Sequence, residues 1–362
     1  MLKKKVMIFA SCVLALAMAL AGCGNGKTSS GNGTNKETFK AGMVTDTGGV
    51  DDKSFNQSSW EGLKKFAGDH HMKVGTDVKY LQSTQASDYS PNLNQMVHQN
   101  FNIVFGIGFL MQNDIQKVAQ QNPKAHLGII DAVAVDKHNK PLKNVANITF
   151  KEQQGSFLVG VVAGLTTKSN KVGFVGGVNS ALLKKFENGF KAGVKTVNPK
   201  ATIFAQYAGA FNAPDKGRDI ASTMYAKGAD IIYASAGDTG NGVFTEAKNL
   251  RKNGKKVWVI GVDKDQYAQG LPQNVTLTSM VKRVDQAIYD VTKKTKAGHF
   301  PGGRVLEYGL QEKGVGLAPT TKNVPQKVLN EVNKYKKQII NGDITAPTTD
   351  KEYQKYLSDL KQ

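Results

Sequence analysis

From Phe39 onward, short apolar segments alternate with longer amphipathic segments, and this alternation constrains the fold more than any other feature of the sequence. The segments "FKAGMVTD", "DVKYLQ" and "FNIVFGIG" have the length and apolar character of buried strands. The segment 54–69 repeats apolar residues at helical spacing, with Trp60, Leu63 and Phe66 on one face. Strands that alternate with helices in this way predict parallel sheets built from right-handed βαβ units.

The alternation of predicted strands and helices occurs twice along the chain. A long helix is predicted over 151–168, and a second series of strands and helices follows it from "KVGFVGGV" onward. The 362 residues are enough for two cores. The sequence therefore predicts an α/β protein of two doubly wound, Rossmann-like lobes in series. Periodicity does not decide whether the segment after Val275 stays with the second sheet or returns to the first.

The first 22 residues have the pattern of a bacterial lipoprotein signal. "MLKKK" is positively charged, and the apolar stretch 6–21 is shorter than the ~20 residues that span a bilayer. Small residues then precede Cys23, so we expect cleavage before Cys23 and lipidation of its thiol. Residues 23–37 become a lipidated cysteine with a flexible Gly/Ser/Asn-rich tether. The predicted location is the extracytoplasmic face of the cell membrane. An ordinary cleavable signal is the alternative.

The formal net charge is +19, but its lysines are scattered, in pairs such as Lys64-Lys65 and Lys255-Lys256. This spacing is typical of a solvated surface, and we expect no nucleic-acid partner. A weaker functional interpretation of the positive charge is a general attraction to a negatively charged cell envelope. Cys12 lies inside the predicted signal, so the mature chain has no disulfide and no catalytic cysteine.

Ligands of open α/β sheets bind beyond the carboxyl ends of the strands, so residues that follow the predicted strands are the candidate site residues. These positions combine acids, small residues, a lysine and aromatic rings. The candidates are Asp46, Phe55, Asn56, Asp131, Phe211, Gly237, Asp263 and Lys282. Each also has a structural alternative, because acids and amides at strand ends cap helices and glycines form turns.

The stretch "DTGGVDDKSFNQ" after the first strand holds the densest group of acids. Its spacing does not match an EF-hand, so we expect no metal ion. We expect Asp51 and Asp52 to cap the helix that begins at Ser54. No histidine follows a predicted strand, and neither a G-x-S-x-G elbow nor a phosphate-binding loop is present. We therefore expect no cofactor and no catalytic residue, and predict that the chain is not an enzyme.

Several longer motifs together resemble one family. "DTGGVDDKSFNQSSWEGL", "KVGFVGG", "YASAGDTGNGVFTEAK" and "VIGVDKDQY" match the basic membrane protein family of substrate-binding lipoproteins. The match covers about residues 38–345. The best-understood members are purine nucleoside receptors of ABC importers. The resemblance implies a fold similar to type I periplasmic binding proteins, with two lobes joined by a three-crossing hinge.

With that fold, we expect lobe 1 to comprise 38–148 plus about 279–300, and lobe 2 to comprise 149–278 plus about 301–345, with 346–362 as a C-terminal tail. The resemblance implies that a nucleoside, with a purine as the first expectation, binds between the lobes. Phe55 and Phe211 then sandwich the base, and Asn56 and Asp131 meet its edge. The ribose hydroxyls then meet two acids and a lysine at strand ends, Asp46, Asp263 and Lys282. They also meet the backbone near Gly237.

The implied partners are a nucleoside, an ABC transporter permease and the membrane, through the lipid on Cys23, with the chain itself a monomer. We expect Lys282 to supply the counter-charge for Asp46 or Asp263. Phe186 is a further candidate for lining the site, with helix core as its alternative. Three other functions stay open: a receptor for another small polar solute such as a sugar, a surface lipoprotein in adhesion or sensing, and, least supported, an enzyme that cleaves nucleosides.

Overall fold

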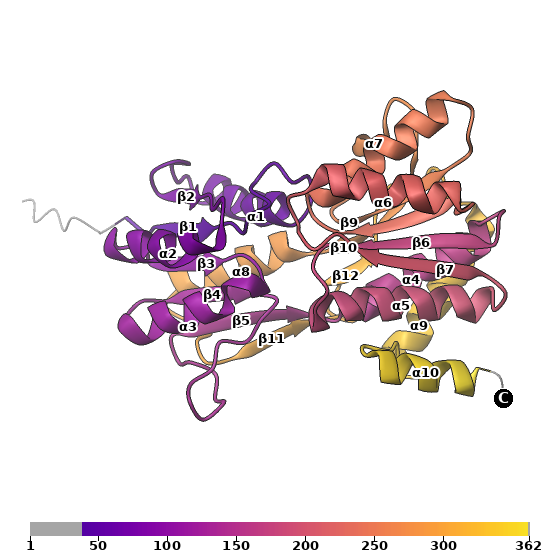
Figure 1. The fold of residues 1–362 in the computed structure, drawn as a ribbon. Coiled ribbons are helices and arrows are strands. Elements are labelled where there is room, and N and C mark those ends of the chain that lie inside the picture. Colours follow the sequence, from indigo (N-terminus) through magenta and orange to yellow (C-terminus); the bar gives the residue numbers. More distant parts are fainter. Residues whose placement is uncertain (1–37, 361–362) are drawn as a thin grey trace, which may run out of the picture. The chain divides into compact units, whose positions relative to one another are not determined.

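The computed structural model describes residues 38–360, and the predicted signal, the lipidation site Cys23 and the tether lie outside these residues. The described chain forms two six-stranded sheets with helices on their faces (Figure 1). The first sheet has the order β11-β5-β4-β3-β1-β2, and all of its strand pairs are parallel. Its strands are β1 (Ala41–Val44), β2 (Val78–Leu81), β3 (Ile103–Gly106), β4 (Leu127–Ile130), β5 (Val145–Phe150) and β11 (Val305–Tyr308).

The second sheet has the corresponding order β12-β10-β9-β8-β6-β7 and is parallel except for the edge strand β12, which runs antiparallel to β10. Its strands are β6 (Lys171–Gly176), β7 (Thr202–Tyr207), β8 (Ile231–Ser235), β9 (Trp258–Asp263), β10 (Thr276–Lys282) and β12 (Val315–Leu317). The predicted fold class, α/β with two doubly wound lobes, is confirmed.

Helices cover both faces of each sheet, and most of them pack in pairs. Around the first sheet lie α1 (Phe55–Asp69), α8 (Val284–Lys296), α2 (Tyr89–His98) and α3 (Gln112–Gln121). Around the second lie α4 (Glu152–Thr166), α5 (Ala181–Val197), α6 (Pro214–Ala226), α7 (Thr239–Lys252), α9 (Gln326–Asn341) and α10 (Asp350–Asp359). Three short 3₁₀ helices complete the fold: η1 (Ala86–Asp88), η2 (Phe109–Met111) and η3 (Tyr267–Gly270). Within residues 38–360, no helix combines the length and apolar character that crossing a membrane requires.

The chain crosses between the sheets three times, from β5 into α4, from β10 into α8, and from β11 to β12. Two expected boundaries need correction. The range 301–345 was expected in lobe 2, but β11 pairs with β5 of the first sheet. The second crossing follows Lys282, where β10 ends, rather than residue 279. A short, half-exposed edge strand such as β11 has the same pattern beside either sheet, so periodicity does not identify its partner.

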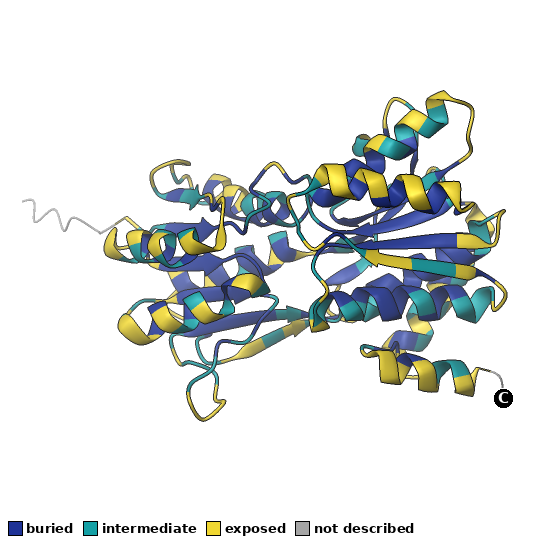
Figure 2. Ribbon diagram, viewed as in Figure 1, coloured by how far each residue is buried: buried dark blue, intermediate teal, exposed yellow. Residues whose placement is uncertain are grey.

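The central strands are buried, and the outer faces of the helices carry the exposed side chains (Figure 2). The expected tail 346–362 contains α10, which packs on α5. The long helix α4 packs closely on α5 through glycine residues. A Cβ on Gly160 would lie 2.3 Å from the carbonyl oxygen of Phe190, and one on Gly193 of α5 would lie 2.0 Å from that of Phe157. These backbones touch because neither helix has a side chain at the contact.

We predict that Gly193→Ala lowers the free energy of unfolding by about 1–3 kcal/mol, because the added methyl group forces two helix backbones apart. Gly68→Ala is the matched control, since no heavy atom lies within 4 Å of a Cβ built at that position of α1. This control should gain about 0.5–1 kcal/mol from the higher helix propensity of alanine. Chemical denaturation of both variants measures the difference. Equal stability of the two would contradict this account of the α4–α5 contact.

Candidate ligand-binding site

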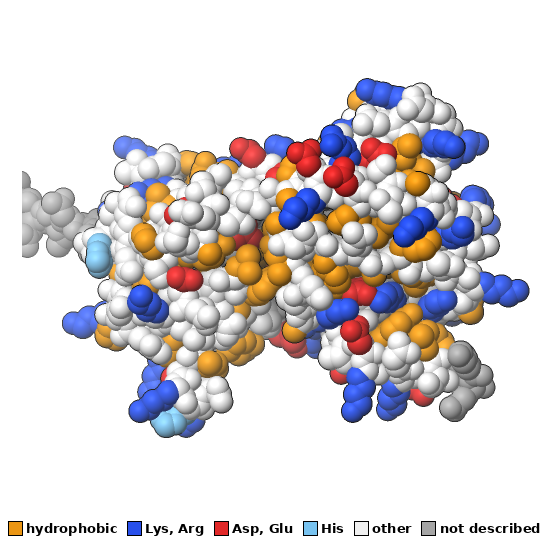
Figure 3. All heavy atoms as spheres, viewed as in Figure 1, with side chains coloured by type: hydrophobic (Ala, Val, Ile, Leu, Met, Phe, Trp, Pro, Cys, Tyr) orange, Lys and Arg blue, Asp and Glu red, His pale blue; other side chains and the backbone are white. Residues whose placement is uncertain are grey.

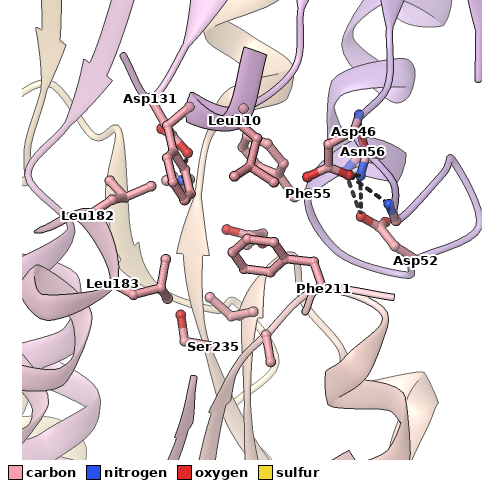
Figure 4. Close-up of a pocket in the computed structure, with 18 of the residues that line it drawn as sticks. Asp46, Asp52, Phe55, Asn56, Leu110, Asp131, Leu182, Leu183, Phe211 and Ser235 are labelled. Atoms are coloured by element: carbon pink, nitrogen blue, oxygen red, sulfur yellow. Dashed lines mark hydrogen bonds and ion pairs between the residues drawn. The ribbon is translucent and has the colours of Figure 1, made fainter. Parts of the chain in front are cut away.

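A cavity of about 520 Å³, including the space at its mouth, lies where the carboxyl ends of strands from both sheets meet (Figure 4). All of the candidate residues chosen from strand ends line it: Asp46, Phe55, Asn56, Asp131, Phe211, Gly237, Asp263 and Lys282. On the face shown in Figure 3, apolar side chains gather where the lobes meet, and lysines and arginines are spread over the surrounding surface.

Asp46 is held in place by hydrogen bonds from the loop that follows β1. Its Oδ1 accepts from the backbone N–H of Gly48 at 2.8 Å and from Nδ2 of Asn56 at 2.7 Å. The same Nδ2 also donates to Oδ2 of Asp52 at 3.0 Å, and Oδ1 of Asn56 accepts from the backbone N–H of Asp46 at 3.2 Å. Both amide hydrogens of Asn56 are therefore used within the protein (Figure 4). This leaves Oδ2 of Asp46 without a donor among the described residues.

Asp52, and not Ser54, caps α1. Its carboxylate accepts from the backbone N–H groups of Ser54, Asn56 and Gln57 at 2.9, 2.8 and 3.1 Å. The expected cap by Asp52 is thus confirmed, although this residue also lines the cavity. Asp51 points to solvent with 92% of its side chain exposed, so the expectation that it also caps the helix is wrong.

Ser54 instead connects the two lobes. Its hydroxyl donates to Oδ2 of Asp263 at 2.5 Å, so an acid at the end of β9 is bonded to the start of α1. The next residue after Asp263, Lys264, pairs with Glu61 of α1 at 2.5 Å and donates to Gln57 of α1 at 2.8 Å. These contacts hold the start of α1 against the end of β9.

Lys282 is the buried cation of the cavity, with 2% of its side chain exposed. Its Nζ lies 2.6 Å from Oδ2 of Asp131 and 3.8 Å from Oε1 of Glu152. The ion pair of Lys282 is with Asp131, which the first sheet brings opposite the end of β10, and the same charge also works against the burial that raises the pKa of Asp263, as expected of a counter-charge for that acid. The ammonium also lies 4.7 Å from the centre of the Phe55 ring.

Burial changes the ionisation of the acids. Loss of solvent raises the pKa of Asp46 to about 6, although hydrogen bonds from Asn56 and Gly48 oppose the rise. Burial likewise raises the pKa of Asp263 to about 6, against the attraction of Lys282 and the hydrogen bond from Ser54. For Lys282, burial by itself lowers the pKa, but the attraction of Asp131, Asp263 and Glu152 outweighs it and leaves the pKa raised. The lysine is accordingly charged at neutral pH.

Asp131 and Asp263 have an uncommon backbone conformation, with φ of 66° and 64°. Side chains other than glycine adopt this left-handed region infrequently, although aspartate tolerates it better than most. The two residues also occupy equivalent places, since β4 and β9 hold the same rank in their sheets. Both are cavity-lining acids that follow or end a central strand.

Sequence reasoning missed several lining residues. Four apolar lining residues and one serine were not predicted: Leu110, Leu182, Leu183, Val262 and Ser235. The first turn of α5 follows β6 directly, so extending the strand-end rule by a few residues would have found Leu182 and Leu183. Phe186 fulfils both of its expected roles, because it lines the cavity and is buried in the core. Glu152, behind Lys282, was also missed.

Within residues 38–360, no group of three or more His, Cys, Asp or Glu side chains is arranged to hold a metal ion. The acids of the cavity meet amide, hydroxyl and ammonium donors instead.

Comparisons with known proteins identify relatives along almost the whole chain. Residues 39–350 match the family model Bmp, described as "ABC transporter substrate-binding protein PnrA-like". The chain is 49% identical over 359 residues to a "CD4+ T-cell-stimulating antigen" of Listeria innocua, covering 96% of this chain and 99% of the relative. It is 41% identical to the "ABC transporter nucleoside-binding protein BmpA" of Lactococcus lactis, covering 96% and 100%.

Solved structures agree on the fold. A solute-binding protein of an ABC transporter system from Aeropyrum pernix superposes with a TM-score of 0.77 at 25% identity, covering 89% of this chain and 97% of that one. An arabinose-binding protein from Geobacillus stearothermophilus superposes with a TM-score of 0.58 at 14% identity, covering 82% and 99%. The second likeness shows the fold alone.

The raised pKa of Asp46 predicts a stability that depends on pH. Between about pH 4 and 6 the folded protein keeps a proton that the unfolded chain releases, so stability is lost as the pH rises through this window. Asp46→Asn removes the buried charge and keeps the shape of the side chain. We expect this variant to be more stable than the wild type at pH 7.5, by on the order of 2 kcal/mol.

Denaturation at pH 7.5 and at pH 4 checks this prediction, because the difference should shrink towards zero at the lower pH. Asp51→Asn is the control, since that side chain is 92% exposed and its substitution should change little at either pH. If the wild type is more stable than Asp46→Asn at pH 7.5, the charge of Asp46 does not lower the free energy of unfolding, and the prediction is wrong.

Proposed function

The chain belongs to the family of PnrA-like ABC transporter substrate-binding proteins, and on that premise we propose that it captures nucleosides between its lobes and delivers them to an ABC importer. The observation that carries this proposal is the lining of the cavity, which combines aromatic rings from both lobes with buried carboxylates. A nucleoside offers the matching groups: a flat base, a hydrogen-bonding base edge and two adjacent ribose hydroxyls. We take a purine nucleoside as the first ligand to test.

Two rings supply the contacts for a base. Phe55 begins α1 in lobe 1, Phe211 follows β7 in lobe 2, and both reach the cavity (Figure 4). Stacking on an aromatic side chain contributes about 1–3 kcal/mol per base. Because the rings come from different lobes, a base placed between them favours the closed arrangement of the lobes. Closure of this kind is how a receptor signals occupancy to its transporter.

The carboxylates suit the ribose. Oδ2 of Asp46 and the carboxylate of Asp263 can accept hydrogen bonds from hydroxyl groups, and such charge-assisted bonds are stronger than neutral ones. The cation Lys282 is already paired with Asp131. A lining dominated by acids opposes a phosphate group, so the proposed ligand is a nucleoside rather than a nucleotide. We assign the backbone near Gly237 to the same part of the ligand.

Asp131 is the proposed acceptor for the base edge. Its Oδ1 is buried and accepts no hydrogen bond among the described residues. Asn56 was expected to meet the base edge as well, but both of its amide hydrogens are directed at Asp46 and Asp52. We therefore propose that Asn56 acts chiefly by fixing Asp46.

We further propose that the protein is a monomer, held on the extracytoplasmic face of the membrane by a lipid on Cys23. A sugar receptor is the second candidate function. The observation that favours it is the pair of phenylalanines in the cavity lining, Phe55 and Phe211, since sugars also stack on aromatic rings.

Native mass spectrometry of freshly purified protein, followed by calorimetry with nucleosides, nucleotides and pentoses, separates these functions. We expect saturable heat with nucleosides, no release of free base, and weaker or no heat with the corresponding nucleotides. Heat with a pentose and none with any nucleoside would replace the proposal with the sugar receptor. Release of free base would identify an enzyme.

Phe211→Ala should weaken nucleoside binding by about 5- to 150-fold, because it removes one stacking surface worth ~1–3 kcal/mol. Phe204→Ala is the matched control. Phe204 is a half-buried phenylalanine of the same strand region, and it packs against the core around α6 rather than the cavity. Calorimetry should give wild-type affinity for the control. Unchanged affinity in Phe211→Ala would remove this ring from the site.

A further inference from the structure

Glu152 is a buried acid that the proposed ligand contacts do not use. It begins α4, directly after the first crossing between the sheets, and its side chain is fully buried. It does not line the cavity, because Lys282 lies between Glu152 and the other acids. A buried carboxylate is costly unless it is paired, so a position of this kind calls for an explanation.

The two oxygens of Glu152 have different surroundings. Oε2 accepts from Nζ of Lys185 at 3.2 Å, and the same ammonium donates to the carbonyl oxygen of Phe150 at 3.2 Å. These bonds fix the carboxylate. Oε1 faces Lys282 at 3.8 Å, which is too long for a hydrogen bond, and it has no donor among the described residues.

Lys282 therefore lies between two carboxylates and is bonded to only one of them. Its Nζ is 2.6 Å from Oδ2 of Asp131 and about one ångström beyond bonding distance from Oε1 of Glu152. Three phenylalanine rings surround the ammonium, with centres at 4.7 Å for Phe55 and 5.4 Å for Phe150 and Phe186. Faces of aromatic rings tolerate a cation, so a short movement between the carboxylates keeps it in favourable surroundings.

We propose that Glu152 is a positioning residue, which accepts the ammonium of Lys282 when a ligand donates hydrogen bonds to Asp131. A ligand hydrogen that reaches Asp131 competes with the ammonium for the same carboxylate. Movement onto Oε1 of Glu152 then leaves neither the lysine nor the glutamate unpaired. This inference rests on the proposed function. It adds a residue that does not contact the ligand but changes the free energy of ligand binding.

The ionisation of Glu152 sets the conditions for the test. Burial raises its pKa to about 7, against the attraction of Lys282, while Asp131 raises it further and Lys185 lowers it. Measurements at pH 8.5 therefore keep the carboxylate charged. They also lie well above the raised pKa values of Asp46 and Asp263, both about 6, so these acids do not titrate during the experiment.

The test is calorimetry of Glu152→Gln with the nucleoside that the wild type binds. The amide keeps the shape of the side chain but is a weaker acceptor, so we expect Kd to rise about tenfold or more. Glu187→Gln is the matched control: Glu187 is a buried acid on α5 paired with two lysines, Lys184 and Lys191, outside the cavity. It should bind like the wild type even if its thermal stability falls.

A crystal structure of the wild-type complex provides a second measurement that does not depend on the folding of a variant. We expect Nζ of Lys282 at about 2.7–2.9 Å from Oε1 of Glu152, and farther from Asp131 than in the present structure. An ammonium that stays on Asp131 in the complex, or a wild-type Kd in Glu152→Gln, overturns the role of Glu152 and leaves the proposed function intact. If the wild type binds no nucleoside, the proposed function fails and this inference fails with it.

Discussion

Both sheets direct the carboxyl ends of their parallel strands at one central cavity, and the site depends on this arrangement. Asp46, Asp131, Asp263 and Lys282 come from four separate strands, yet they line the same space. In a parallel sheet every strand ends at the same edge, so each lobe collects its loops on one side. Two such edges face each other here because the chain crosses between the sheets three times.

The two lobes contribute to the cavity in a related way, although no sequence repeat connects them. The strands β4 and β9 have the same rank in their sheets, and each is followed or ended by an aspartate in the left-handed conformation. The strands β5 and β10 also correspond, and they lead to Glu152 and Lys282. Lys282 and Glu152 thus come from equivalent strand ends of the two sheets, and the crossing segments bring them together.

The cost of burying these charges is visible in their ionisation. Burial raises the pKa values of Asp46 and Asp263 to about 6 and that of Glu152 to about 7. The protein tolerates these acids because each receives donors, from Asn56, Ser54 and Lys185 respectively. These partly unsatisfied carboxylates suit the proposed ligand, which is rich in hydrogen-bond donors, and their burial lowers the stability of the ligand-free protein.

The sequence alone determined the strand–helix alternation, the two-lobed α/β fold and eight of the residues that line the cavity. These follow from periodicity and from the rule that parallel strands end at one edge, both of which are local properties. Only the tertiary structure decided which groups meet. It paired Lys282 with Asp131, bonded the hydroxyl of Ser54 to Asp263, and added β11 to the first sheet. Distances between residues far apart in the chain depend on how the lobes pack, and no local pattern encodes them.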